Sequence, residues 1–314
     1  MKTRITLTAM LALTACGGEA PAPQASLPAS YDMVALSDID TAEKMTARCE
    51  AGEAGFRERL AAIEAFDGAP TVDNYYVPLD SLISSATTLQ SHASSLSGVH
   101  PDPDLRAAGE ACDLLINKFF SDLSLSRPVY DAVGAIDTSN ADAETRHSIE
   151  KTLLSYRLAG VDKDEATRER IRALNEEIAA IGQEFNRNIR EDVRYLELDS
   201  VDDLAGLPDD YIAARPPNED GKILISTQYP DVLPFFEYAE SDALRKEMVI
   251  LFRSRAYPQN EPVLRKLIEA RFELAQLVGF DNYAELVTAD KMSGSPQRVA
   301  EFLADLKEYT TAAQ

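Results

Sequence analysis

The sequence predicts a mostly α-helical protein with one small antiparallel β element near residues 194–226. Apolar residues recur at spacings of three and four along most of the 314-residue chain, which is the period of an amphipathic helix. Glycine and proline fall mainly between these periodic stretches, where helices begin and end. Only two short segments, separated by a proline-containing loop, have the alternating or aliphatic pattern of strands. These observations favour a multi-helix fold.

The beginning of the chain predicts export. Lys2 and Arg4 precede an uncharged apolar stretch that ends at residue 15. This stretch is too short to cross a bilayer of about 30 Å as a helix, and its layout is typical of a secretory signal peptide. It runs into Leu-Thr-Ala-Cys, which resembles the bacterial lipobox and makes Cys16 the expected site of lipidation. The alternative is an ordinary signal peptide, residues 1–15, beside an incidental cysteine.

We expect a lipid on Cys16 to hold the protein on a bacterial membrane, facing the periplasm, without spanning that membrane. Gly17 follows the cysteine, where an aspartate would favour retention at the inner membrane, so the outer membrane is the expected location. Residues 16–30 are rich in proline and alanine and lack apolar periodicity, which is typical of a tether. The folded body is therefore expected to begin at residue 31.

Five helices are predicted in the first part of the body. They cover residues 40–66, 71–97, 102–124, 141–159 and 162–193. Gly160 stands where the fourth helix should end, and Asp162 with Glu165 has the pattern of a capping box for the fifth. The apolar stripe of the fifth helix comprises Ile171, Leu174, Ile178, Ile181, Phe185, Ile189 and Val193. Its other faces are charged, and the residues expected to be solvated are Arg168, Glu169, Arg170, Glu176, Glu177 and Arg190.

The regular helical period stops near residue 194. Residues 195–198 and 222–226 both fit short strands, and we expect them to form one antiparallel pair. Helices are expected again at 242–256, 261–278 and 281–291, and a last one follows Ser295 with Pro296 at its first position. We divide the body into a helical N-terminal domain, residues 31–240, and a second region, residues 241–314.

The charge of the chain argues against two classes of partner. Its formal net charge is −22, from 31 basic and 53 acidic residues. A surface this acidic repels phosphate backbones, so nucleic-acid binding is not expected. It also disfavours the basic amphipathic contacts that peripheral membrane helices use. We therefore expect contact with a membrane only through the lipid on Cys16.

Cys49 and Cys112 are the only cysteines that follow Cys16. Two cysteines in an exported protein are a candidate disulfide. Each also lies on the apolar stripe of a predicted helix, so the alternative is a pair of inert buried thiols. In both cases their expected role is structural.

No complete catalytic apparatus is visible in the sequence. Zinc hydrolysis on a helix needs His-Glu-x-x-His, and none of the three histidines, His92, His100 and His147, begins that motif. Glu144 and His147 have the Glu-x-x-His spacing of di-iron helical bundles, but the required second copy is missing. A nucleophile elbow, a phosphate loop and a dinucleotide fingerprint are missing as well. The sequence therefore predicts no catalytic and no metal-ligating residue among its 314 positions.

From about residue 147 onward, segments of the chain resemble, in order and spacing, the M3 family of zinc metallopeptidases. No single segment is diagnostic, and before residue 147 the likeness is only a general helical one. The matching segments are residues 147–160, QEFNRNI at 183–189, LAGLP at 204–208, 244–247, FRSRA at 252–256, 277–280 and 299–303.

The resemblance implies a mostly helical fold split by a deep channel, with one zinc ion on the channel floor. This chain is similar to the N-terminal half: the resemblance makes residues 31–240 a wall of the channel and residues 241–314 the start of the catalytic region. It places the zinc ligands and the catalytic Glu beyond residue 314. It implies short peptides as substrates and the C-terminal catalytic half as a partner in cis, and it implies that the 314-residue chain alone is inactive. The alternative is a stand-alone, non-catalytic helical lipoprotein that acts as a binding or scaffold module.

Overall fold

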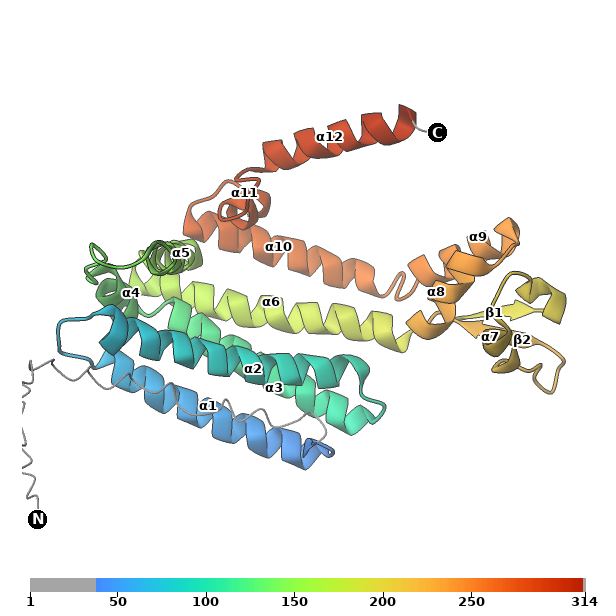
Figure 1. Ribbon diagram of the computed structural model, residues 1–314, viewed down its shortest axis with the longest axis horizontal. Coiled ribbons are helices and arrows are strands. Elements are labelled where there is room, and N and C mark those ends of the chain that lie inside the picture. Colours follow the sequence, from blue (N-terminus) through green and yellow to red (C-terminus); the bar gives the residue numbers. More distant parts are fainter. Residues whose placement is uncertain (1–37, 313–314) are drawn as a thin grey trace, which may run out of the picture. The chain divides into compact units, whose positions relative to one another are not determined.

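The computed structural model of the protein describes residues 38–312 (Figure 1). The predicted signal peptide, the lipidation site at Cys16 and the tether lie outside the described residues and stay predictions. Within residues 38–312 the chain forms helices and one two-stranded antiparallel sheet, which confirms the predicted fold class. No helix within this range is both long enough and apolar enough to span a bilayer.

Four long helices form the first core (Figure 1). α1 (Ala42–Glu64), α2 (Val77–Val99) and α3 (Pro103–Ser124) pack against one another, and α6 (Glu165–Glu191) packs against α3. Each helix turns an apolar stripe toward these neighbours, as its spacing predicts. Large fully buried side chains here include Met45, Leu79, Leu105, Ile116 and Phe119. Burial of a side chain of this size contributes about 1.5–3 kcal/mol to the stability of the fold.

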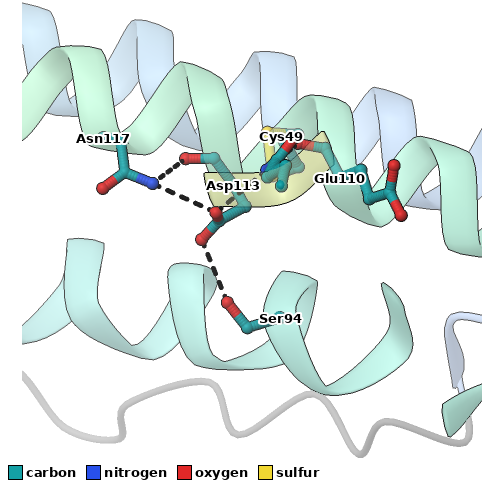
Figure 2. The surroundings of a disulfide bond; sticks show 7 residues. Cys49, Ser94, Glu110, Asp113 and Asn117 are labelled. Carbon is teal, nitrogen blue, oxygen red and sulfur yellow. Dashed lines mark hydrogen bonds between the residues drawn. A yellow bond between two sulfur atoms is a disulfide. The ribbon is translucent and has the colours of Figure 1, made fainter. Parts of the chain in front are cut away.

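A disulfide joins α1 to α3 inside this core (Figure 2). The sulfur atoms of Cys49 and Cys112 lie 2.07 Å apart, and both residues are buried. Next to the bond, the Asp113 carboxylate accepts hydrogen bonds from Ser94 Oγ at 3.0 Å and from Asn117 Nδ2 at 3.1 Å. Helix α3 is therefore tied to α1 covalently and to α2 through Asp113.

The first turn of α6 differs from the predicted capping box. The N-cap is Asp164, whose carboxylate accepts a hydrogen bond from the backbone N–H of Thr167 at 2.9 Å. The prediction that used Asp162 was wrong because the chain makes a turn after Gly160 before the helix begins. Gly160 itself ends α5 (Ala143–Ala159) with a φ of 94°, as predicted, since glycine adopts this left-handed conformation without a steric penalty.

Three short helices fall outside the predicted pattern: α4 (Arg127–Gly134), α7 (Asp209–Ala213) and α8 (Tyr229–Tyr238). Single turns of other helix types, η2 (Val72–Tyr76) and η3 (Val201–Leu204), precede α2 and α7. Helix α8 contains two prolines, which normally indicate a loop. Pro230 lies in the first turn, where no backbone N–H is needed, whereas Pro234 lies inside the helix. Burial of Val232 and Phe235 from this helix compensates for the lost hydrogen bond.

Residues 195–253 form a lobe with a core of its own, which we call the β lobe. β1 (Tyr195–Leu198) pairs antiparallel with β2 (Ile223–Ser226), which confirms the predicted pair. Helix α8 packs against β2 and against α9 (Asp242–Arg253), which also packs against β1. The buried residues of the β lobe are Leu196, Leu198, Leu204, Leu207, Tyr211, Ile223, Ile225, Val232, Phe235, Ala239 and Met248. This core takes residues from both sides of position 240.

After the β lobe the chain returns to the long helices. α10 (Asn260–Val278) packs along α6, and α11 (Tyr283–Thr288) packs against α10. α12 (Pro296–Ala312) follows α11 and is the last described element (Figure 1). Helices were predicted in all three places, and α11 is shorter than expected.

A close approach of α2 and α3 at Gly109 yields a first prediction. A β-carbon at Gly109 would lie 2.7 Å from the carbonyl oxygen of Ala93, so Gly109→Ala should force the two helices apart. We expect this variant to lower the free energy of unfolding by about 1–3 kcal/mol. In Gly182→Ala, the matched change in α6, the new β-carbon meets nothing within 4 Å, and we expect a gain of about 0.5–1 kcal/mol. Urea denaturation of both variants tests this, and a change of the same sign in both would contradict it.

Candidate functional site

The segment GQEFNRNIR, residues 182–190 of α6, contacts two helices that are distant from it in the sequence, α3 and α10. One side of this segment contacts α3. Gln183 Nε2 donates to the Glu110 backbone oxygen at 3.0 Å, Arg187 Nη1 donates to Glu110 Oε2 at 2.9 Å, and Arg190 also donates to the Glu110 carboxylate. Glu110 therefore receives two guanidinium groups from successive turns of α6.

The other side of the same segment contacts α10. Asn188 Nδ2 donates to Asn260 Oδ1 at 2.8 Å, and Asn260 Nδ2 donates to the Phe185 backbone oxygen at 2.9 Å. Asn260 is buried, so water does not reach its side-chain amide. These two bonds give the amide the hydrogen-bond partners that a buried polar group needs. The apolar contacts beside them come from Ile178, Ile181, Phe185, Val263 and Leu267. The segment is thus a brace that holds α3, α6 and α10 in one layer.

The environment of Arg190 differs from the one predicted from the sequence. This arginine was expected on a solvated face, but its side chain is 28% exposed and pairs with Glu110. Helix α6 has neighbours on two sides, so one of its charged faces is also an interface. Sequence periodicity identifies the apolar stripe, but it does not show that a second helix covers the charged residues beside that stripe.

The Glu110 cluster predicts a dependence of stability on pH. Burial opposes the charge of Glu110, but hydrogen bonds from Arg190 and Arg187 outweigh burial and hold the carboxyl pKa below its ordinary value of 4.5. A lowered pKa in the folded state means that the stabilisation is complete above the unfolded-state pKa and is lost as the pH falls through the folded-state pKa. We therefore expect the free energy of unfolding to fall as the pH drops below 4.5, the ordinary value for this carboxyl group.

Glu110→Gln tests this expectation because it keeps the shape of the side chain and removes its titration. Its unfolding free energy should depend less steeply on pH than that of the unchanged protein below pH 4.5, the ordinary value for Glu110. Glu177→Gln, at an exposed position on the same helix, is the control and should leave the slope unchanged. Identical slopes for Glu110→Gln and the unchanged protein would show that Glu110 contributes nothing to the pH dependence.

Ionisable side chains also gather in a cavity of about 810 Å³ where α1, α3, α4 and α6 meet. Its cations pair with its acids: Arg57 contacts Asp122 at 2.6 Å, and Arg172 contacts Glu169 at 2.8 Å. The charged lining residues are Arg57, Glu64, Lys118, Asp122, Arg127, Glu165, Arg168, Glu169, Arg172 and Glu176. Because positive and negative charges are equal in number here, the cavity is an ion-pair network between helices rather than a site with one dominant charge.

The histidines and acids do not form a metal site within residues 38–312. No group of three or more His, Cys, Asp or Glu side chains is arranged there to hold a metal ion. His92 lies on α2, His100 at its C-terminal end and His147 on α5. His147 and Glu144, which share the Glu-x-x-His spacing, are both exposed.

The C-terminal helices expose apolar side chains in regular stripes. On α10, Leu264, Ile268 and Phe272 are spaced by four residues and are 45%, 59% and 53% exposed. On α12 the exposed apolar residues are Phe302, Leu303, Leu306 and Tyr309. Apolar stripes on helices normally face a partner, and contiguous exposed apolar surface indicates an interaction site. These two stripes are therefore the candidate contact surface of the chain.

Comparison with known proteins shows which peptidases this chain is similar to. Residues 235–314, which include the exposed stripes of α10 and α12, match Peptidase family M3. Oligopeptidase A of Haemophilus influenzae is 28% identical over 256 residues, which are 76% of this chain and 38% of that protein. The matches support membership of peptidase family M3. Oligopeptidase A of Escherichia coli is 27% identical over 270 residues, covering 80% of this chain and 39% of that protein.

The M3-like chain spans well under half the length of these relatives. Saccharolysin of Saccharomyces cerevisiae, 24% identical over 265 residues, shows the same proportion, with 81% of this chain aligned to 36% of that protein. The alignments with these peptidases are longer than the family match, so they also take in helices that precede residue 235. The likeness to these peptidases therefore extends to residues before 147, where the sequence alone indicates only a general helical likeness.

Proposed function

We propose that this chain is the N-terminal portion of an exported zinc metallo-oligopeptidase that hydrolyses short peptides. The observation that carries the proposal is the match to M3 peptidases over about three quarters of this chain but 38% of the relative. In this proposal the zinc ligands and the catalytic Glu are supplied by sequence that follows residue 314, as the family resemblance implies. The zinc ion, when bound there, activates water and polarises the scissile carbonyl.

The described helices have a positioning role in this proposal. The brace at residues 182–190 keeps α3, α6 and α10 in one layer, which suits the rigid wall of a peptide channel. The exposed stripes of α10 and α12 are then the surface that the catalytic half covers in cis. Phe302, Leu303, Leu306 and Tyr309 of α12 are exposed in this chain, and their burial favours association of the two halves.

Two proteins test the proposal: the 314-residue chain, and the chain extended through the following coding sequence. The extended protein should bind about one zinc ion and hydrolyse a quenched-fluorescent peptide, whereas the 314-residue chain should do neither. Metal content by mass spectrometry and the fluorescence rate are the measurements. Hydrolysis by the 314-residue chain with its own bound metal would overturn the proposal. A stop codon directly after residue 314 would favour the stand-alone binding or scaffold lipoprotein.

We also propose that the mature protein is anchored by a lipid on Cys16 to the periplasmic face of the outer membrane. The support is the charge and length of residues 1–15 and the Leu-Thr-Ala-Cys sequence. Cys16→Ser should abolish incorporation of labelled fatty acid and move the protein from the membrane fraction to the soluble fraction. Retained labelling in the Cys16→Ser variant would exclude this cysteine as the anchor.

A further inference from the structure

A cluster of aromatic and cationic side chains surrounds Phe252 at the C-terminal end of α9. The rings of Tyr229 and Phe236 stand edge-on to the Phe252 ring, with centroids 5.7 Å and 5.8 Å away. The guanidinium carbons of Arg255 and Arg253 lie 4.1 Å and 5.7 Å from its centroid. We call these five residues the Phe252 cluster. Both guanidinium groups are therefore in cation–π contact with the same ring.

The guanidinium groups of Arg253 and Arg255 have N–H donors that no carboxylate accepts within residues 38–312. Among residues 38–312 neither forms an ion pair with a carboxylate, and the one hydrogen bond of Arg255 runs from its Nε to the Phe252 backbone oxygen at 3.1 Å. Asp192 interacts with Arg255 through its charge, but its carboxylate already accepts from Arg194 at 2.7 Å and from the Ala256 N–H at 2.6 Å. Within the described part of the chain, no carboxylate therefore pairs with the terminal nitrogens of either arginine.

The surface around these arginines suits a peptide. Tyr229 is 60% exposed, and Ile250, one turn before Arg253 on α9, is 56% exposed. Arginine presents a planar fork that matches a carboxylate, and each such fork takes one carboxylate. In an extended peptide the side chains at positions i and i+2 lie on one face about 7 Å apart. Both guanidinium carbons lie within 5.7 Å of one ring centroid, so two acidic side chains on one face of such a peptide can each reach one of them.

We propose that the Phe252 cluster binds a short acidic peptide in extended form, with one acidic side chain on Arg253 and one on Arg255. Apolar parts of the peptide lie on Tyr229 and Ile250. The net charge of −22 disfavours acidic ligands at long range, but salt at physiological strength screens charges beyond about 8 Å, so the local pairs decide at contact. Binding needs no zinc centre. If the proposed function is also correct, the same cluster should make acidic peptides preferred substrates, and only this consequence rests on the proposed function.

Fluorescence anisotropy with the full 314-residue chain tests this binding. The probes are labelled Ala-Glu-Ala-Glu-Ala, its Gln and Lys counterparts, and all three are capped at both ends so that no terminal carboxylate contributes. The Glu peptide should bind about tenfold tighter than the Gln peptide, since each exposed charge pair changes affinity by up to about fivefold. Equal binding of the Glu and Gln peptides, or no binding of either, would overturn the proposal.

Variants locate the site. Arg253→Gln with Arg255→Gln should reduce binding of the Glu peptide to the level of the Gln peptide. Arg127→Gln is the matched control, because Arg127 also lies over a ring, 5.8 Å from Tyr130, but is already paired with Asp131 at 2.8 Å. Arg253→Gln alone keeps the test valid if the double variant misfolds, since Arg253 is exposed. An equal loss in Arg127→Gln would place the binding elsewhere and overturn the proposal.

The outcome is separable from that of the proposed function. Anisotropy reports binding by the 314-residue chain, whereas the proposed function is tested by hydrolysis in the extended protein. Acidic peptides that bind here while the extended protein cuts no peptide leave the Phe252 cluster as a binding surface. If the extended protein hydrolyses peptides but the 314-residue chain does not bind the Glu peptide, the proposed function stands and the proposed binding surface fails.

Discussion

Replacing Cys49 and Cys112 by alanine together is expected to lower the free energy of unfolding by about 4 kcal/mol. The two cysteines are 63 residues apart in the sequence. A bridge that closes a loop of this length restricts the unfolded chain strongly, so its removal favours unfolding. The bridge also lies inside the first core, beside the hydrogen bonds of Asp113, one of which comes from Ser94 of α2 (Figure 2). A loss of this size is a large part of the total stability of an ordinary domain.

Urea denaturation of the oxidised protein and of the double alanine variant measures this effect. Reduction of the unchanged protein should produce a loss of similar size, and the double variant should not respond to reductant. Mass spectrometry under non-reducing conditions should find the peptide with Cys49 joined to that with Cys112. Recovery of both as free thiols from protein exported to the periplasm would show that the two buried thiols do not form the bridge in the cell.

The sequence predicts the long elements well because their pattern repeats many times. α3 and α6 carry apolar stripes over several turns, so the helical period is clear. The strands at 195–198 and 223–226 are short, but they are bounded by changes of composition that mark their ends within one residue. α8 could not be predicted in the same way, because Pro230 and Pro234 indicate a loop unless burial of Phe235 is known to compensate.

The candidate sites are less predictable than the helices, since they depend on contacts between distant residues. Arg190 was expected in solvent, yet its partner Glu110 lies 80 residues earlier in the chain. The exposed stripe of α10 has the same spacing as the buried stripe of α6, and only the fold shows which of the two is covered. The Phe252 cluster likewise needs Tyr229 to approach from another helix. A pattern along one helix does not report its neighbours.

Phe235→Ala is expected to destabilise the β lobe by about 3–5 kcal/mol. Phe235 has no exposed surface and lies in a core whose members all fall between residues 196 and 248. The elements of the β lobe pack chiefly on one another. The cavity left by the Phe235 ring therefore weakens the core of the β lobe and not the first core. We therefore expect the loss to appear as local opening of residues 195–253, at a free energy below that of global unfolding.

Hydrogen exchange separates this outcome from a general loss of stability. In Phe235→Ala, amides of β1 and β2 should lose protection while those of α1 and α3 keep it, because the disulfide and the first core are untouched. Phe272→Ala is the matched control: that ring is 53% exposed on α10, and its removal should change stability by less than about 0.5 kcal/mol. Equal loss of protection in the strands and in α1 would mean that the β lobe and the first core unfold as one cooperative unit.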